Sequence, residues 1–273
     1  MIRSAVTLTL VPEMRGGPFI FSDDLAGTCQ RAADLGFDAV ELFYHEAPAV
    51  NVAELQNLLT NHKLAISAFG TGAGRMKYKL SLTDPDARQR RRAINYITQF
   101  IDVAAQFNTP TIIGSMQGRW GEGGVRREQA LAWLGEALNE LADRAAKHRL
   151  PVLYEFLNRY ETNLLNNVEQ ALGFLRTLRT QNIKLLCDLF HMNIEEPDIA
   201  ASIRYAGDKV GHIHFADTNR HPMGQGHLDM VPIADALDAI NYSGFVSAEA
   251  LPLPDGEAAA RQTIASFQKY FPR

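Results

Sequence analysis

The chain has 273 residues, with 27 Lys and Arg against 31 Asp and Glu, and 46% of its residues are hydrophobic. This composition excludes a disordered chain, and a formal net charge of −4 gives no electrostatic reason to expect a nucleic-acid partner. No apolar run reaches the roughly 18 residues of a membrane-spanning helix, and residues 5–11 are typical of a strand, not of a signal peptide. Cys29 and Cys187 lie far apart, which predicts no disulfide framework and a cytoplasmic location.

Short apolar runs alternate along the chain with longer segments of helical periodicity. The expected strands, in chain order, are residues 4–10, 39–43, 64–69, 111–115, 152–156, 183–187, 211–215 and 245–249. The repeated order of strand and helix is typical of an α/β protein with a parallel sheet.

Several helix ends between these strands are recognisable. Ser22 is expected to cap a first helix that Gly36 ends, and Pro85 is expected at the first position of another. A long helix is expected over residues 125–149, where cationic residues complement the helix dipole before Pro151.

Eight strand–helix units predict a single (β/α)8 TIM barrel over residues 1–273, because such barrels usually contain roughly 250 residues. A doubly wound sheet is the alternative. It would more often carry a glycine-rich phosphate turn, and neither residues 12–18 nor residues 70–74 match that fingerprint. Residues 70–74 are therefore expected to form a flexible loop.

Polar residues end the last four apolar runs, at the rim of the barrel where chemistry is expected. They are Glu155, Asp188, His214 and Glu249, each separated from the next by about one strand–helix unit. A single carboxylate at a strand end often caps a helix or pairs with arginine. Four polar side chains in register on consecutive strands instead indicate a metal site, and this donor set suits Mn²⁺, Mg²⁺ or Co²⁺ better than a structural zinc.

Three longer motifs carry a resemblance to a known family. EFLNRYETN at 155–163, DLFHMNIEE at 188–196 and HIHFADTNR at 212–220 resemble the xylose-isomerase-like barrel superfamily. Within that superfamily they look most like the D-tagatose and D-psicose 3-epimerase group of ketose 3-epimerases. The resemblance is strong over residues 150–255 and mainly architectural before them.

The resemblance implies one divalent metal ion, Mn²⁺ first and Co²⁺ or Mg²⁺ as alternatives. The implied metal ligands are Glu155, Asp188, His214 and Glu249, and the implied substrate contacts are Glu161, His191 and Arg220. His212 lies on the same strand face as His214, and we interpret it as a core residue rather than a support for the site.

The resemblance also implies a reaction, inversion of C3 of a free ketose of the tagatose, psicose, fructose or L-ribulose type. The proton alpha to the C2 carbonyl leaves from one face and a proton returns to the other, through an enediolate that the metal stabilises. Glu155 and Glu249 are the implied acid and base. The expected partner is a small sugar, with no nucleic acid and no membrane, and family analogy suggests a homodimer or homotetramer.

Other functions use a similar barrel. An aldose–ketose isomerase, or an epimerase of a keto-sugar derivative, would use the same machinery. An apurinic-site endonuclease would need further ligands from early strands and a basic surface, and a non-catalytic sugar-binding barrel would not need both glutamates. The sequence leaves open the roles of His45, Trp120, His221 and His227.

Overall fold

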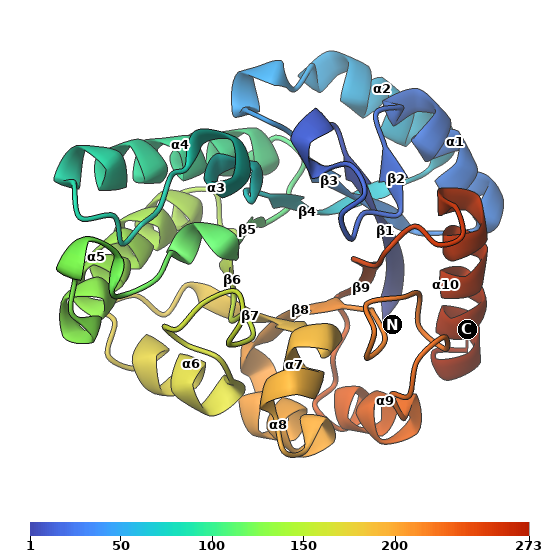
Figure 1. The fold of residues 1–273 in the computed structure, drawn as a ribbon. Helices are drawn as coiled ribbons and strands as arrows, with labels where there is room; N and C mark the ends of the chain where they lie inside the picture. The colour runs from blue at the N-terminus through green and yellow to red at the C-terminus, as the bar shows by residue number, and fades with distance from the viewer. Residues whose placement is uncertain (273) are drawn as a thin grey trace.

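The computed structural model describes residues 1–272, which form a closed barrel of parallel strands surrounded by helices (Figure 1). The barrel closes because β1 pairs in parallel with β3 on one side and with β9 on the other. The predicted (β/α)8 fold is confirmed, and the doubly wound alternative is wrong because an open sheet leaves two edges unpaired.

The eight barrel strands are β1 (Arg3–Thr9), β3 (Ala39–Phe43), β4 (Ala65–Gly70), β5 (Thr111–Ile113), β6 (Val152–Glu155), β7 (Ile183–Asp188), β8 (Val210–His214) and β9 (Phe245–Ala248). A two-residue strand, β2 (Phe21–Ser22), pairs with the end of β1 and was not predicted. Most predicted boundaries differ by one or two residues. The fourth expected strand, 111–115, ends early because Gly114 leaves the extended conformation (φ −109°, ψ −102°) and a 3₁₀ turn follows.

The surrounding helices are α1 (Leu25–Leu35), α2 (Val52–His62), α3 (Ala73–Tyr78), α4 (Ala87–Ala105), α5 (Arg127–Ala146), α6 (Val168–Leu175), α7 (Leu189–Glu195), α8 (Ile199–Ala206), α9 (Met230–Ala239) and α10 (Gly256–Tyr270). In Figure 1 they ring the strands, and α10 packs beside β1, which brings the two ends of the chain to the same side. Among residues 1–272, no helix combines the length and apolarity needed to cross a membrane.

Several predicted helix ends need correction. Asp24, not Ser22, caps α1, since its carboxylate accepts the Gly27 amide hydrogen. Asp86 caps α4 in the same way, so Pro85 lies before the helix instead of at its first position. Ser22 belongs to the short strand β2, where it pairs with Thr9, so the cap position falls to Asp24.

Two other expectations about helices change with the structure. The helix expected over 125–149 is shorter, at Arg127–Ala146. Residues 70–74 are not a free loop, because Gly72 is the residue before α3 and the Thr71 hydroxyl donates to the Ile112 carbonyl at 2.7 Å. This segment is therefore tied to the top of β5.

The barrel interior is filled by side chains rather than open. One layer consists of Ala68, Ile112, Leu153 and Leu186, one residue from each of β4 to β7. The larger apolar core lies between the strands and the helices. Both cysteines are free, in agreement with the prediction of no disulfide framework, and both are buried. This layer closes the β4–β7 side of the barrel below the strand ends, whereas the buried polar side chains of Glu41 on β3 and His212 on β8 also lie in the interior.

Candidate active site

The four side chains that end the last four strands converge on one point. Glu155 is the last residue of β6, Asp188 of β7 and His214 of β8, and Glu249 follows β9. The Nδ1 atom of His214 lies 3.4 Å from an oxygen of Glu155, 3.6 Å from one of Asp188 and 3.4 Å from one of Glu249. All four residues are buried, and one ligand atom of each lies within 4.8 Å of the others.

The donor set fits a divalent cation. Glu155 Oε1 and His214 Nδ1 are buried and have no hydrogen-bond partner, although both face the same point. Buried polar atoms without partners are uncommon and need an explanation. Ligands about 2.1 Å from one ion lie about 3.0–3.4 Å apart in octahedral or tetrahedral geometry. The separations from His214 Nδ1 are close to this range, so an ion at this point would satisfy both orphaned atoms.

Burial and neighbouring charges together shift the pKa values of Glu155 and His214 upward. Burial raises the pKa of Glu155, and the charge of Glu249 acts in the same direction. Burial alone would lower the pKa of His214, but the charges of Glu249 and Glu41 raise it well above its usual value. A cation that binds here therefore competes with protons.

The two carboxylate oxygens of Asp188, at the end of β7, make different contacts. One carboxylate oxygen accepts the Phe190 amide hydrogen at 2.8 Å and caps α7. The other lies 3.4 Å from Arg220 Nη2 and 3.6 Å from His191 Nε2. Burial alone would raise the pKa of Asp188, but the charges of His191 and Arg220 outweigh burial and lower it. The helix cap and the site use different oxygens of one carboxylate.

His191, in the first turn of α7, is buried rather than exposed to solvent. The Tyr160 backbone N–H donates to the amide oxygen of Asn158 at 2.9 Å, so the other end of that amide is its NH₂ group. This NH₂ group donates to His191 Nδ1 at 2.7 Å. A neutral His191 must therefore carry its proton on Nε2. Its Nε2–H is a hydrogen-bond donor 3.6 Å from Asp188 and 3.8 Å from Glu155, beside the metal site.

Arg220 reaches the site from the loop after β8. Its guanidinium bonds to Glu249 and lies over the Phe190 ring, 4.7 Å from the ring centroid. Glu161 is half-exposed and lies 3.8 Å from Arg220 and 3.9 Å from His191. The three predicted substrate contacts therefore lie together, next to the four predicted ligands.

A cavity of about 430 Å³ opens above these residues. Its floor is polar, with Glu155, His191, His214, Arg220 and Glu249, and its walls come largely from the N-terminal half. Phe19 and Phe43 pack edge to face, with ring centroids 4.7 Å apart, and form one apolar wall. The size and the mixed lining are typical of small-molecule sites. Gly114 is needed here, because a Cβ at that position would lie 2.2 Å from Glu155 Oε2.

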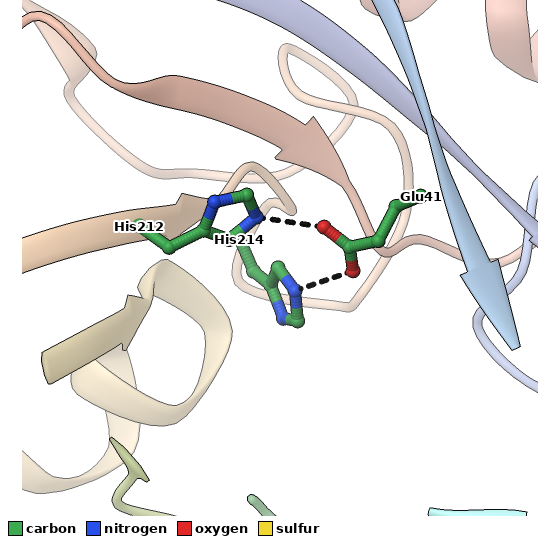
Figure 2. Close-up of side chains that lie close together, drawn as sticks. All are labelled: Glu41, His212 and His214. Atoms are coloured by element: carbon green, nitrogen blue, oxygen red, sulfur yellow. Dashed lines mark hydrogen bonds and ion pairs between the residues drawn. The ribbon is translucent and has the colours of Figure 1, made fainter. Parts of the chain in front are cut away.

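His212 is buried, as expected of a core residue, but it does not merely fill the core. His212 Nε2 lies 2.7 Å from one oxygen of Glu41, whose other oxygen lies 2.9 Å from His214 Nε2 (Figure 2). Burial alone would raise the pKa of Glu41, but the contacts with His214 and His212 lower it. The only local signal was a carboxylate in the middle of the apolar run 39–43, and nothing in the sequence pairs it with residues more than 170 positions away.

Other polar residues that the sequence left open lie outside the cavity lining. They are His45, Trp120, His221 and His227. The indole Nε1–H of Trp120 donates to the Asn163 carbonyl at 2.8 Å, and His45 lies 3.5 Å from Glu46.

A family model described as "Xylose isomerase-like TIM barrel" matches residues 29–270. The chain belongs to this family. The resemblance carried by the three motifs is thereby confirmed, and the strand-end convergence described above lies within the matched region.

Several relatives within the family align with most of this chain. A D-psicose 3-epimerase of Agrobacterium fabrum is 31% identical over 226 residues, which are 81% of this chain and 77% of the relative. An L-ribulose 3-epimerase of Mesorhizobium japonicum is 29% identical over 231 residues, 83% of this chain and 75% of the relative. A crystal structure of a D-psicose 3-epimerase in the presence of D-fructose has a TM-score of 0.83 and 23% identity, and the match covers 98% of this chain and 99% of that one. By this relationship the chain is an enzyme of the isomerase class.

Proposed function

We propose that the protein is a metal-dependent ketose 3-epimerase that inverts C3 of a free keto-sugar of the psicose, tagatose, fructose or L-ribulose type. The observation that carries this proposal is the pair of buried glutamates, Glu155 and Glu249, that flank a point with two orphaned ligand atoms. The names of the relatives, D-psicose 3-epimerase and L-ribulose 3-epimerase, support the substrate class.

Glu155, Asp188, His214 and Glu249 would hold the metal ion. Three carboxylates and one imidazole favour Mn²⁺, with Co²⁺ or Mg²⁺ as alternatives. When bound, the ion would act as a Lewis acid that polarises the C2 carbonyl and stabilises the negative charge of the enediolate.

The two glutamates remove and return the proton at C3. They come from β6 and from the end of β9, with β7 and β8 between them, so they approach a sugar from different directions. One carboxylate removes the proton from one face of C3, and the other returns a proton to the opposite face. Their roles exchange when the epimerisation runs in reverse.

The remaining polar residues hold the sugar in one pose. The Nε2–H of His191 and the guanidinium of Arg220 donate to the O1 and O2 end of the sugar, where charge develops. Glu161 accepts from a sugar hydroxyl near the cavity mouth. The aromatic wall of Phe19 and Phe43 excludes water from one side of the cavity.

The test is deuterium exchange. The protein is stripped with chelator, reloaded with Mn²⁺ and incubated in D₂O with tagatose, psicose, fructose and L-ribulose, and each carbon is followed by NMR. Deuterium at C3 together with the 3-epimer is the expected result. Deuterium at C1 with an aldose product would replace the proposal with an aldose–ketose isomerase. No exchange in any of these sugars would contradict it and point to a keto-sugar derivative.

Substitution of either glutamate tests the assigned roles. We expect Glu155→Gln and Glu249→Gln each to lower C3 exchange at least about 10³-fold, because general acid–base catalysis and a metal ligand are lost together. Glu13→Gln is the matched control, since Glu13 also lines the cavity but is exposed, pairs with Lys77 at 3.4 Å and is not one of the four candidate ligands. A wild-type rate in either buried variant would overturn the assignment. Homo-oligomeric assembly, cytoplasmic location and single-domain organisation stay predictions.

A further inference from the structure

Glu41 occupies an unusual position for a charged residue. It lies in the middle of β3, is completely buried, and points toward the imidazole rings of His212 and His214 on β8 (Figure 2). Burying a carboxylate is costly unless it is hydrogen-bonded. Here one oxygen is 2.9 Å from His214 Nε2, and the other is 2.7 Å from His212 Nε2 and accepts from the Ser67 hydroxyl at 3.2 Å.

We propose that Glu41 is a positioning residue that determines which ring nitrogen of His214 faces the metal site. The proposal rests on the metal centre of the proposed function and adds a determinant of its affinity. An ionised carboxylate only accepts hydrogen bonds, so His214 Nε2 carries a hydrogen. In the neutral imidazole Nδ1 then has the free lone pair, and Nδ1 is the atom that faces Glu155, Asp188 and Glu249.

His212 completes this arrangement by holding the second oxygen of Glu41. The two imidazole rings stand nearly perpendicular, with an interplanar angle of 83° and centroids 5.5 Å apart, so the carboxylate is fixed from two directions. A carboxylate held at both oxygens cannot rotate, and the ring of His214 is therefore held at one angle. Partners of this kind orient ligating histidines in many metal proteins.

The same three residues are not well arranged for a second ion. Glu41 and the two imidazoles are separated by 2.7 and 2.9 Å, which are hydrogen-bond lengths. Two ligands of one ion would lie about 3.0–3.4 Å apart, as estimated from ordinary metal–ligand distances. The separations around His214 Nδ1, at 3.4–3.6 Å, suit an ion better.

Metal affinity tests the proposal without any sugar. Metal-free wild type, Glu41→Gln and Glu46→Gln are titrated with Mn²⁺, and the free ion is followed by electron paramagnetic resonance. We expect one ion per chain in the wild type. In Glu41→Gln we expect a dissociation constant about 10–100-fold higher, which is the usual loss of affinity when such a partner of a ligand is removed. Glu46→Gln is the matched control, because it alters an exposed glutamate–histidine pair near the end of the same strand and should bind like wild type.

A second measurement does not depend on how well the variant folds. In wild type loaded with diamagnetic Mg²⁺, ¹⁵N NMR of the histidine rings should show His214 protonated on Nε2 and not on Nδ1. The opposite tautomer, unchanged Mn²⁺ affinity in folded Glu41→Gln, or two ions per wild-type chain would each overturn the proposal. Loss of affinity in Glu41→Gln without any C3 exchange by wild type would contradict the epimerase function alone. C3 exchange by wild type with unchanged affinity in Glu41→Gln would contradict the positioning role alone.

Discussion

Each histidine of the site depends on one neighbouring side chain for its proton arrangement. Glu41 holds Nε2 of His214, which leaves Nδ1 for a metal, and Asn158 donates to Nδ1 of His191, which leaves an Nε2–H donor for a substrate. The two rings therefore face the cavity with opposite properties: His214 offers a lone pair and His191 offers an N–H donor. Neither assignment follows from the histidines themselves.

Asn158 provides a test of this residue-scale argument. We expect Asn158→Leu to lower kcat/KM about 10–100-fold, since a buried polar group that loses its hydrogen-bond partner costs roughly 1–3 kcal/mol and His191 would no longer be held as a donor. The Mn²⁺ dissociation constant should stay unchanged, because Asn158 does not contact the four metal ligands. The measurement is steady-state kinetics with parallel Mn²⁺ titration.

The control for that variant is Asn139→Leu. The Asn139 amide bridges the Gly135 carbonyl and the Thr180 amide on the outside of the barrel, so its loss should affect stability but not kcat/KM. Equal kinetics in Asn158→Leu and wild type would contradict the role given to Asn158.

The loop between β8 and α9 is organised around one buried carboxylate. Asp217 accepts backbone N–H groups from Thr218 at 2.7 Å, Gly224 at 2.8 Å and Leu228 at 3.0 Å. Gly226 passes so close that a Cβ there would lie 2.2 Å from an Asp217 oxygen. This loop carries Arg220, whose backbone is left-handed at φ 60°. Asp217 therefore holds the element that delivers the guanidinium to the site.

Acid should loosen this loop. Burial alone would raise the pKa of Asp217, but the backbone N–H bonds outweigh burial and lower it. A carboxylate whose pKa is lower in the folded state stabilises the fold above its unfolded pKa of about 3.9, and that contribution is lost as the pH falls through the folded value. We expect Asp217→Asn to reduce the free energy of unfolding at pH 7 by about 1–3 kcal/mol and to raise KM more than it lowers kcat.

Denaturant unfolding at several pH values checks this expectation. The difference in stability between wild type and Asp217→Asn should shrink as the pH falls from 5 towards 3. A difference that does not change with pH would show that the charge of Asp217 is not what holds the loop.

At the scale of the whole molecule, the two halves of the barrel make different contributions. Strands β6 to β9 provide the four candidate metal ligands, and the first half provides Glu41 and the cavity walls. Three of those ligands are carboxylates, and their negative charges crowd one buried point unless a cation balances them. A bound ion would link four consecutive strands across the barrel rim.

Metal binding should therefore stabilise the entire barrel. At a free Mn²⁺ concentration about 100 times the dissociation constant, linkage adds about 2.7 kcal/mol to the free energy of unfolding. For a chain of this size that corresponds to a rise in Tm of roughly 5–10 °C. Calorimetry of the chelated and reloaded protein measures the shift, and Asp188→Asn should show little of it. A Tm that does not depend on Mn²⁺ would contradict the metal centre.

The barrel and the rim residues that converge could both be predicted from local patterns in the chain. Eight strand–helix repeats predict closure, and a parallel barrel brings the carboxyl ends of all strands to one rim, so Glu155, Asp188, His214 and Glu249 can be found from their positions at strand ends. Local chemistry also predicted correctly that Gly36 ends α1. Periodicity and capping depend on residues that are close in the chain, and this is why they can be read from it.

The contacts that support those residues could not be predicted in this way. Glu41 meets His212 and His214 from 171 and 173 positions away, and Asn158 meets His191 from 33 positions away. These contacts exist only once the barrel closes and side chains from distant strands face one another across its interior. A local pattern records which face of a strand a residue occupies, but not which group lies opposite, and a hydrogen bond needs both.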